Sequence, residues 1–290
     1  MSKASSELVL NPDGSIYHCN IKPEHLADLV ITVGDPNRVE RVSRHFDQIE
    51  HKASKREIIS HTGSLNGKRI TVISTGMGTD NIDIVLTELD ALANINLETG
   101  EENLTKRRLT IVRFGTSGAL QGDIPIDSIC LGTHGLGLDG LLHHYVGSEK
   151  VFDHAMGEAF TKHSNWSTKK AEPYIVKGSE RLFNVLSSEQ THHGITATAC
   201  GFYGPQGRYL RLEPNPVNIN ELLTDFEFEG HRISNFEMET SAIYGLSAMM
   251  GHEALSVNTI VANRIRGEFS KNPYESVDRM IEYALERLTK

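Results

Sequence analysis

Two arginines lie where apolar segments of the chain meet glycine-containing turns. Arg38 belongs to the segment GDPNR, which begins at Gly34 directly after the apolar run 29–33. A glycine at a strand end lets backbone N–H groups approach an anion, and a guanidinium beside it adds further donors. This pattern is typical of a phosphate-binding turn, although an ordinary turn with a surface arginine has the same sequence.

Arg113 lies inside the apolar run 109–114 and is followed by Gly-Thr-Ser-Gly at 115–118. A charged side chain in such a run needs an anionic partner, because an unpaired charge in an apolar interior is costly. That partner is either phosphate, with the hydroxyl of Thr116 as an extra donor, or a carboxylate of the protein itself. The segment STGMG at 74–78 is a weaker phosphate signal, since no Gly-Lys-Ser/Thr follows it.

Two carboxylates, Glu237 and Glu239, precede the apolar segment 240–250. Side chains two positions apart at a helix start point in different directions, so one carboxylate can face the hydroxyls of a ligand while the other braces the site. Acidic residues are also common at helix N-termini for their interaction with the helix dipole. Both interpretations remain open from the local sequence.

The elements that would carry these residues alternate along the chain. Short runs rich in β-branched residues predict strands at 29–33, 69–74, 109–114, 128–131, 195–200 and 255–261. Helical spacing predicts helices at 39–46, 82–92, 240–250 and 274–288, the last with one apolar face. This alternation predicts an α/β fold with a single-domain mixed, largely parallel β-sheet flanked by α-helices.

One domain covers the whole range 1–290 in this prediction. Residues 1–16 are expected to form an N-terminal tail, and the polar stretch 94–108 a surface insertion. A second polar segment, 214–225, has no set of core-forming elements after it that would make another domain. No internal repeat of fixed period is present.

Composition narrows the classes of function. Of 290 residues, 38% are hydrophobic, which allows a sizeable core, and the net charge of −9 disfavours nucleic acid and anionic membranes as partners. The three cysteines show no paired spacing, so neither a disulfide framework nor a metal site is expected. No apolar run approaches the ~20 residues of a membrane span. We expect a cytoplasmic protein.

Five segments together are similar to one family. GDPNRV, STGMG, VRFGTSGAL, FYGPQGRY and NFEMETSA occur in the order and approximate spacing of the nucleoside phosphorylase-I superfamily, from about Tyr17 to the C-terminus. The resemblance implies a nucleoside phosphorylase-I fold, also called phosphorylase/hydrolase-like. It also implies a pentosyltransferase of nucleoside salvage that uses inorganic phosphate as co-substrate and no other cofactor.

The segment FYGPQGR at 202–208 resembles the base-binding segment of uridine phosphorylases. The resemblance implies that Gln206 and Arg208 read the uracil edge and that Phe202 stacks on base or sugar. An amide can pair with a ring N–H and a carbonyl together, and a guanidinium donates to carbonyl oxygens. The implied reaction converts uridine and phosphate to uracil and α-D-ribose 1-phosphate. The order Gly204-Pro205 is the reverse of the family's.

The resemblance also assigns the remaining site residues. Phosphate would be held by Gly34, Arg38, Arg113 and Thr116, together with Arg56 of a neighbouring subunit. The ribose would lie on Met238 and Glu239, with Glu237 supporting Glu239 and His18 of the neighbour reaching the 5′-hydroxyl. Arg113, Arg208 and Glu239 would form the catalytic set. A homo-oligomer, either a dimer or a trimer of dimers, follows from this sharing. Some members bind a monovalent cation near the residue that matches Glu57, but we assign none here.

The choice of base depends on Asn263. Purine-cleaving relatives carry an aspartate at this place as the general acid for the leaving base, and an amide cannot supply that proton. A pyrimidine is therefore favoured, with uridine, deoxyuridine and thymidine unranked. A purine nucleoside phosphorylase or another nucleoside-cleaving relative is the first alternative, and a non-catalytic sensor of nucleoside or phosphate is the second. A lone dinucleotide-like G-x-G pattern at 135–140 gives little support to an oxidoreductase.

Overall fold

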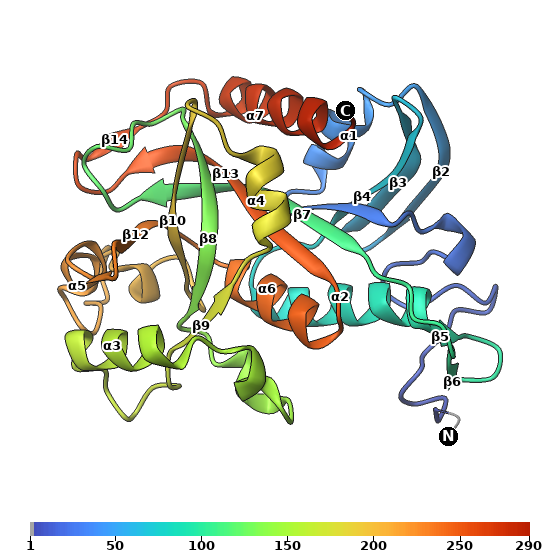
Figure 1. Cartoon of the computed structure of the whole chain (residues 1–290), viewed down its shortest axis with the longest axis horizontal. Coiled ribbons are helices and arrows are strands. Elements are labelled where there is room, and N and C mark those ends of the chain that lie inside the picture. The colour runs from blue at the N-terminus through green and yellow to red at the C-terminus, as the bar shows by residue number, and fades with distance from the viewer. Residues whose placement is uncertain (1–2) are drawn as a thin grey trace.

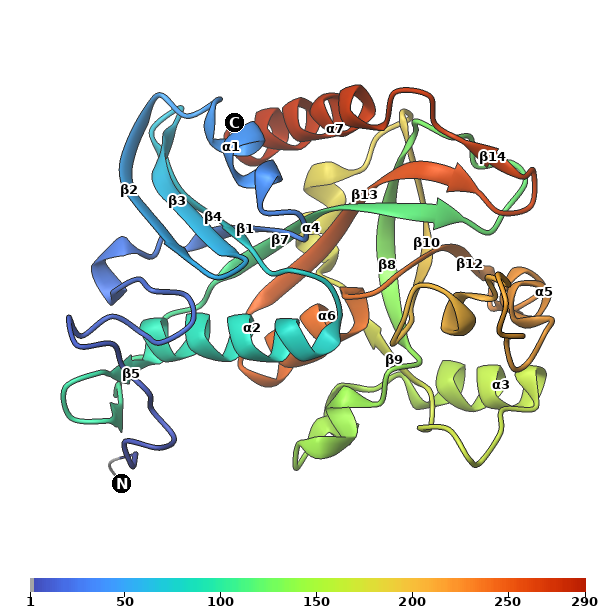
Figure 2. The same ribbon diagram turned by 180° about the vertical axis from the view of Figure 1, so that it is seen from behind.

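A twelve-stranded mixed β-sheet forms the centre of the computed structural model, which describes residues 3–290, and helices lie on either side of it (Figures 1 and 2). The strands are β1 (Leu29–Val33), β2 (Gln48–Lys55), β3 (Ile58–Leu65), β4 (Lys68–Ser74), β7 (Thr110–Ala119), β8 (Ile129–Gly137), β9 (Tyr174–Lys177), β10 (Thr191–Thr198), β11 (Glu227–Phe228), β12 (His231–Glu237), β13 (Glu253–Asn263) and β14 (Glu268–Phe269). The helices are α1 (Asn37–Ser43), α2 (Thr79–Asn94), α3 (His154–Ser164), α4 (Glu180–Leu186), α5 (Ile219–Thr224), α6 (Thr240–Met249) and α7 (Pro273–Leu288).

The sheet consists of two parallel blocks. Strands β4, β1, β7 and β13 run parallel to one another, as do β8, β10 and β12. The blocks meet at the antiparallel pair β8 and β13, and β12 also pairs antiparallel with β7. These pairings close five strands into a ring. The predicted α/β class with a largely parallel sheet is confirmed, with antiparallel pairs at the join and at the edges.

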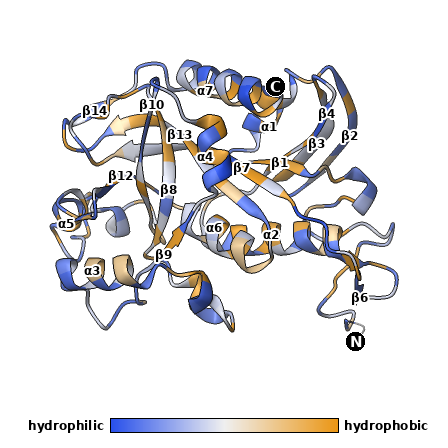
Figure 3. Cartoon of the chain, in the orientation of Figure 1, coloured by the Kyte–Doolittle hydropathy of each residue, from blue (hydrophilic) through white to orange (hydrophobic). Residues whose placement is uncertain are grey.

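The core lies between the sheet and the helices. Strand β1 is apolar almost throughout and its residues 30–33 are buried, which is typical of a strand covered on both faces. Helix α7 buries one face and exposes the other, as its amphipathic pattern predicts; the buried residues that were predicted are Val277, Met280, Ile281, Ala284, Leu285 and Leu288. Figure 3 shows hydrophobic residues along β1 and both kinds of residue along α7.

Two predictions at the level of elements were wrong. The chain does not turn after Arg113, because β7 continues to Ala119 and so includes Thr116. Within this longer strand Gly115 leaves room for the guanidinium of Arg113, since a Cβ there would collide with it. The polar segment 214–225 is not purely irregular, because α5 forms within it and buries Ile219 and Leu223.

The remaining predicted elements lie close to where the patterns place them, while several others were missed. The sequence patterns did not predict the hairpin of β2 and β3, the strands β9 and β12, or the helices α3 and α4. In the stretch 94–108, α2 ends and two short strands, β5 (Ile95–Asn96) and β6 (Glu101–Glu102), pair antiparallel. Within residues 3–290, no helix is both long and apolar enough to cross a membrane.

Candidate functional site

A cavity of about 630 Å³ lies where β1, β4 and β12 end, beside β7. Ligands of α/β sheets commonly bind at the carboxyl ends of strands. The cavity is lined by every residue that the sequence analysis assigned to the site except His18 and Arg56; these lining residues are Gly34, Arg38, Arg113, Thr116, Phe202, Gln206, Arg208, Glu237, Met238 and Glu239. The fold thus brings together these predicted residues from four separate segments of the chain.

Arg113 forms the centre of the cavity wall. Its Nη2 donates to a carboxylate oxygen of Glu239 and lies 3.2 Å from Oε2 of Glu237, and its Nη1 donates to Oδ1 of Asn258 at 2.6 Å. The buried arginine therefore has protein carboxylates as partners, which was one of the two alternatives for this residue. A guanidinium has five N–H donors, so these contacts leave donors for a further anion.

The two glutamates differ in their partners. Glu237 ends β12 and accepts hydrogen bonds from the hydroxyl of Thr198 at 2.8 Å and from the backbone N–H groups of Glu239 and Thr240. Burial raises the pKa of Glu237, and the charge of Arg113 opposes this effect. Glu239 accepts from the N–H of Gly78 at 2.8 Å. Glu237 thus fixes the turn into α6, and this turn holds Glu239 in the cavity wall.

The end of the cavity near β1 is rich in donors. Arg38 follows Gly34 in the first turn of α1, and its Nη1 donates to the carbonyl of Phe114 at 3.0 Å. Burial, with the charge of nearby Arg113 as a second cause, lowers the pKa of Arg38 to about 10. Two close guanidiniums that disfavour each other's charge are stabilised by an anion between them. Phosphate meets that requirement.

The segment 202–208 forms the other end of the cavity. Nη1 of Arg208 donates to the carbonyl of Phe202 at 2.6 Å and to Oε1 of Gln206 at 2.7 Å. The guanidinium also lies 3.7 Å from the centre of the Phe202 ring. The two side chains predicted to read the base are therefore adjacent, and without a ligand they bind each other. Gly207, at φ +65°, provides the left-handed turn between them.

Sequence reasoning missed Arg264 and Asn258. Arg264 follows β13, and its Nη1 is buried with no hydrogen-bond partner in the described chain. Burial and the neighbouring charge of Arg264 lower the pKa of Arg208 to about 10, so these two cations face each other near the base-reading segment. Asn258 is a buried amide in the apolar strand β13. A polar residue inside an apolar run was the available signal for Asn258.

Asn263 serves the structure of the turn after β13. Its Nδ2 donates to the carbonyls of Gln121 and Ile124, and its Oδ1 accepts from the N–H groups of Ile265 and Arg266. All four hydrogen-bonding positions of the amide are thus occupied. The side chain is 1% exposed and does not line the cavity.

His18 and Arg56 lie outside the cavity of their own chain. Nδ1 of His18 lies 2.6 Å from Oε1 of Glu88 on α2. Arg56 is exposed in the turn between β2 and β3, in a left-handed conformation with φ +54°. No hydrogen bond or ion pair of its side chain to another described residue is present, although the adjacent Glu57 lines the cavity.

Within residues 3–290, no group of three or more His, Cys, Asp and Glu side chains is arranged to hold a metal ion.

The family model described as the phosphorylase superfamily matches residues 28–290. A uridine phosphorylase of Thermococcus kodakarensis is 30% identical over 92% of this chain and 84% of its own length. A uridine phosphorylase of Haemophilus influenzae is 28% identical over 87% of this chain and 88% of its own length.

A solved structure is also similar over nearly its full length. The crystal structure of a Trypanosoma brucei nucleoside phosphorylase, described as showing uridine phosphorylase activity, aligns with a TM-score of 0.87 and 29% identity. The alignment covers 97% of this chain and 99% of that one. The two chains therefore share their architecture over nearly their whole lengths.

Proposed function

The chain belongs to the phosphorylase superfamily, and we propose that it is a uridine phosphorylase, which converts uridine and phosphate to uracil and α-D-ribose 1-phosphate. The observation that carries the proposal is the composition of one cavity, with arginines at one end, a carboxylate in the middle and an amide with a guanidinium at the other. These groups match phosphate, ribose and uracil in that order.

Phosphate is proposed to bind beside Gly34 and Thr116, between Arg38 and the free donors of Arg113. Because Arg113 is buried and Arg38 is partly buried, their attraction for a dianion is screened less than that of exposed side chains. Arg56 of a neighbouring subunit is proposed to add a third cation. The bound phosphate then attacks C1′ of the ribose.

The ribose is proposed to lie on Met238 with its hydroxyls on Glu239. The bonds from Gly78 and Arg113 fix this carboxylate before substrate arrives, so little reorganisation is needed during the reaction. The negative charge of Glu239 stabilises the oxocarbenium-like ribose that forms as the glycosidic bond breaks. Catalysis then consists of positioning and electrostatics without a covalent enzyme intermediate. His18 of the neighbour is proposed to contact the 5′-hydroxyl.

Uracil is proposed to leave as an anion stabilised by Arg208 and Gln206. For this, the two side chains exchange their mutual hydrogen bond for bonds to the base. The unpartnered Nη1 of Arg264 supplies another donor nearby. Asn263 lies outside the lining of the cavity and its amide is no acid, so it supplies no proton to a leaving base, which favours a pyrimidine over a purine.

The proposal requires no metal or organic cofactor, and it places the enzyme in the cytoplasm as a homo-oligomer. The experiment that tests it follows the absorbance of uridine with purified protein, with and without phosphate. We expect a loss of absorbance that needs phosphate and that yields ribose 1-phosphate. Uridine binding without turnover in phosphate would replace the enzyme with a nucleoside sensor.

A further inference from the structure

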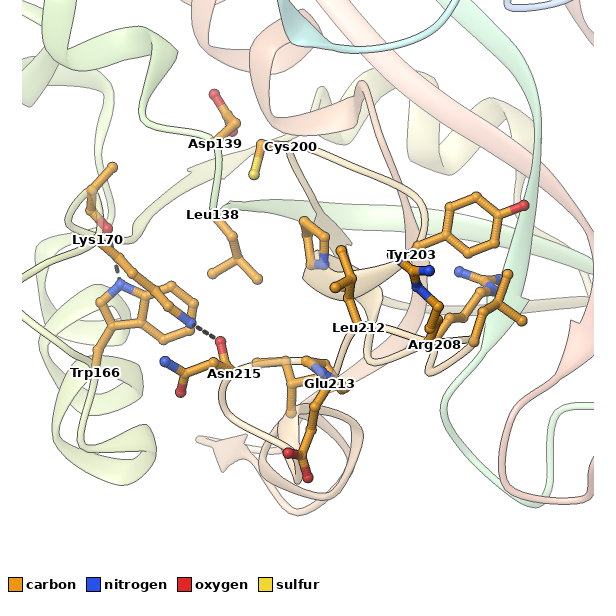
Figure 4. Close-up of a pocket in the computed structure, with 17 residues that line it drawn as sticks. Leu138, Asp139, Trp166, Lys170, Cys200, Tyr203, Arg208, Leu212, Glu213 and Asn215 are labelled. Atoms are coloured by element: carbon orange, nitrogen blue, oxygen red, sulfur yellow. Dashed lines mark hydrogen bonds between the residues drawn. The ribbon is translucent and has the colours of Figure 1, made fainter.

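A second cavity, of about 840 Å³, lies beside the substrate cavity and shares the side chain of Arg208 with it. Figure 4 shows the residues that line this second cavity. Neighbouring residues of one segment line the two spaces. Phe202 and Gln206 line the substrate cavity, Tyr203 and Pro205 line the second cavity, and Arg208 lines both. Its volume is within the range of ~300–1,000 Å³ that is typical of small-molecule sites. None of the proposed steps of phosphorolysis uses this space.

The lining of the second cavity is largely apolar and includes a tryptophan. In Figure 4, Leu138 and Leu212 reach toward the interior from different segments, and the indole of Trp166 lies at one side. The indole is held in place because its Nε1 donates to the carbonyl of Ala171 at 2.9 Å. A fixed indole with aliphatic neighbours favours a flat ring as a ligand.

The charge available to a ligand in this cavity is positive. The carboxylate of Asp139 is already occupied by the hydroxyls of Tyr174 and Ser241, at 2.8 and 2.9 Å. Figure 4 shows it directed away from the centre, and the carboxylate of Glu213 extends outward at the opposite edge. Lys170, by contrast, lies across the indole face.

The ammonium group of Lys170 has N–H donors that no residue in the described part of the chain uses. Its Nζ lies 4.9 Å from the centre of the Trp166 ring and donates to the carbonyl of Asn215 at 2.5 Å. An ammonium has three N–H donors, and this hydrogen bond uses one of them. The side chain therefore presents a cation directly beside an aromatic surface, a combination that suits an aromatic ligand with an acidic group.

We propose that this cavity is a second binding site for a planar aromatic molecule that carries one acidic group, with its ring against Trp166 and Leu212 and its acidic group on Lys170. An occupant that packs on Tyr203 and Pro205 also stabilises the segment 202–208 in its present conformation. Because Arg208 is bonded to Gln206 in that conformation, the occupant competes with the reading of the base. This consequence rests on the proposed function, whereas the binding site itself does not.

The binding test uses 1-anilinonaphthalene-8-sulfonate, an aromatic sulfonate, as the probe. Trp166 is the single tryptophan of the chain. Selective excitation of the indole therefore gives energy transfer to probe bound within transfer range of Trp166, and the variants at Lys170 and Cys200 locate that probe. We expect saturable transfer with one probe per chain. Absence of saturable transfer, or a stoichiometry above one, would overturn the proposal.

Two neighbouring lysines provide a matched pair of variants. Lys170→Ala removes the proposed partner of the acidic group and is expected to weaken probe binding about tenfold, the effect of losing one charge-assisted hydrogen bond. Lys169→Ala removes an equal charge from an exposed position outside the lining and should leave affinity unchanged. Lys170→Arg should retain binding. Equal affinities in Lys170→Ala and Lys169→Ala would contradict the assigned orientation and the site.

Cys200 allows the cavity to be filled covalently. It is the only exposed cysteine, since Cys19 and Cys130 are buried, and its sulfur faces the second cavity in Figure 4. Modification with N-phenylmaleimide should abolish energy transfer in the wild-type protein. Cys200→Ser, which cannot react, should keep full transfer after the same treatment. Undiminished transfer in the modified wild type would place the probe elsewhere.

The effect on the reaction is measured separately. With the probe at a concentration that saturates the wild type, we expect KM for uridine to rise about three- to tenfold in the wild type and in Lys169→Ala; this corresponds to a coupling of ~1 kcal/mol. In Lys170→Ala, whose affinity for the probe is about tenfold lower, the rise at the same probe concentration should be clearly smaller. KM for phosphate should not change. Binding with unchanged KM would refute the coupling through 202–208, and absence of any phosphorolysis would refute only the proposed function.

Discussion

Arg113 and Glu239 bind each other in the wall of the substrate cavity, where they are only 5% and 4% exposed. Glu237 lies on the same guanidinium, so two carboxylates share one arginine. Removal of a partner from such a buried group leaves a charge without compensation. Variants of the two glutamates therefore separate binding of substrate from support of the fold.

Glu239→Gln is expected to lower kcat/KM for uridine by ~10²-fold or more, because the charge that faces the ribose is lost. Glu237→Gln should lower the free energy of unfolding more, by about 2–3 kcal/mol, because an amide nitrogen would then face N–H donors. Steady-state kinetics and urea unfolding measure the two effects. A larger loss of stability in Glu239→Gln would reverse the assigned roles.

Arg208→Ala is expected to lower kcat/KM for uridine by ~10²-fold or more, from the loss of ~3 kcal/mol of hydrogen bonding to the base. The side chain also stacks on Phe202 and holds its carbonyl, so the segment loosens as well. Arg264→Ala leaves those contacts intact. It should therefore reduce kcat/KM while loosening the segment 202–208 less than Arg208→Ala does. Steady-state kinetics of the wild type and both variants measure these effects. An unchanged kcat/KM for uridine in Arg208→Ala would show that Arg208 does not contact the base.

The sequence predicted that Arg113 needs an anionic partner, but it could not say which one. The answer depends on contacts between β7, β12 and α6, which are far apart in the chain and whose pairing no local pattern encodes. Arg264 was missed for the same reason, since its unpartnered Nη1 becomes apparent only once neighbouring strands surround it. Residue types were thus predictable, and their partners were not.

Selectivity for the base is expected to follow from the absence of an acid where the sequence has Asn263. The protein should cleave uridine well and inosine poorly, because no acid is present at this position to protonate a purine. Initial rates with both nucleosides at equal concentration decide the question. Since Asn263 holds four backbone groups, Asn263→Asp should destabilise the turn rather than create a purine enzyme. Efficient cleavage of inosine by the wild type would contradict the pyrimidine assignment.

Strands and helices with a pronounced pattern were predicted well, and those whose order comes from tertiary contacts were not. Strand β1 and helix α7 have a continuous apolar run and a clear helical face, respectively. Strand β2 is mostly exposed and polar, and it is ordered through its ladder with β3. Strand β12 ends in the carboxylate of Glu237, whose buried position requires partners from β10 and α6.

Stability is expected to decrease as the pH falls, in part through His134. Burial lowers the pKa of His134 to about 4 from an ordinary value near 6.5, so the unfolded chain takes up a proton more readily than the folded one. The resulting decrease in the free energy of unfolding begins below pH ~6.5, continues to pH ~4, and amounts to about 1–2 kcal/mol at pH 5. Urea unfolding at pH 7.5 and 5 should show a smaller pH dependence in His134→Gln than in the wild type. An identical dependence would show that His134 titrates normally.

The active site is expected to be shared between subunits through Arg56. This side chain is exposed in the turn after β2 and has no partner within the described chain, while Arg38 and Arg113 already lie in the cavity of its own subunit. An isologous interface would place the turn of each subunit at the cavity of the other. Arg56→Ala and Glu239→Gln homo-oligomers should then each be nearly inactive.

Mixed oligomers of these two variants distinguish sharing from action within one subunit. If Arg56 acts across the interface, one site of a mixed pair collects both substitutions and the other collects neither, so activity returns. If Arg56 serves its own subunit, every site carries one substitution and activity stays low. Two different affinity tags confirm that mixed oligomers have formed. Recovered activity in the doubly purified fraction is the expected result, and activity no higher than that of the separate variants would place Arg56 in its own subunit or outside the site.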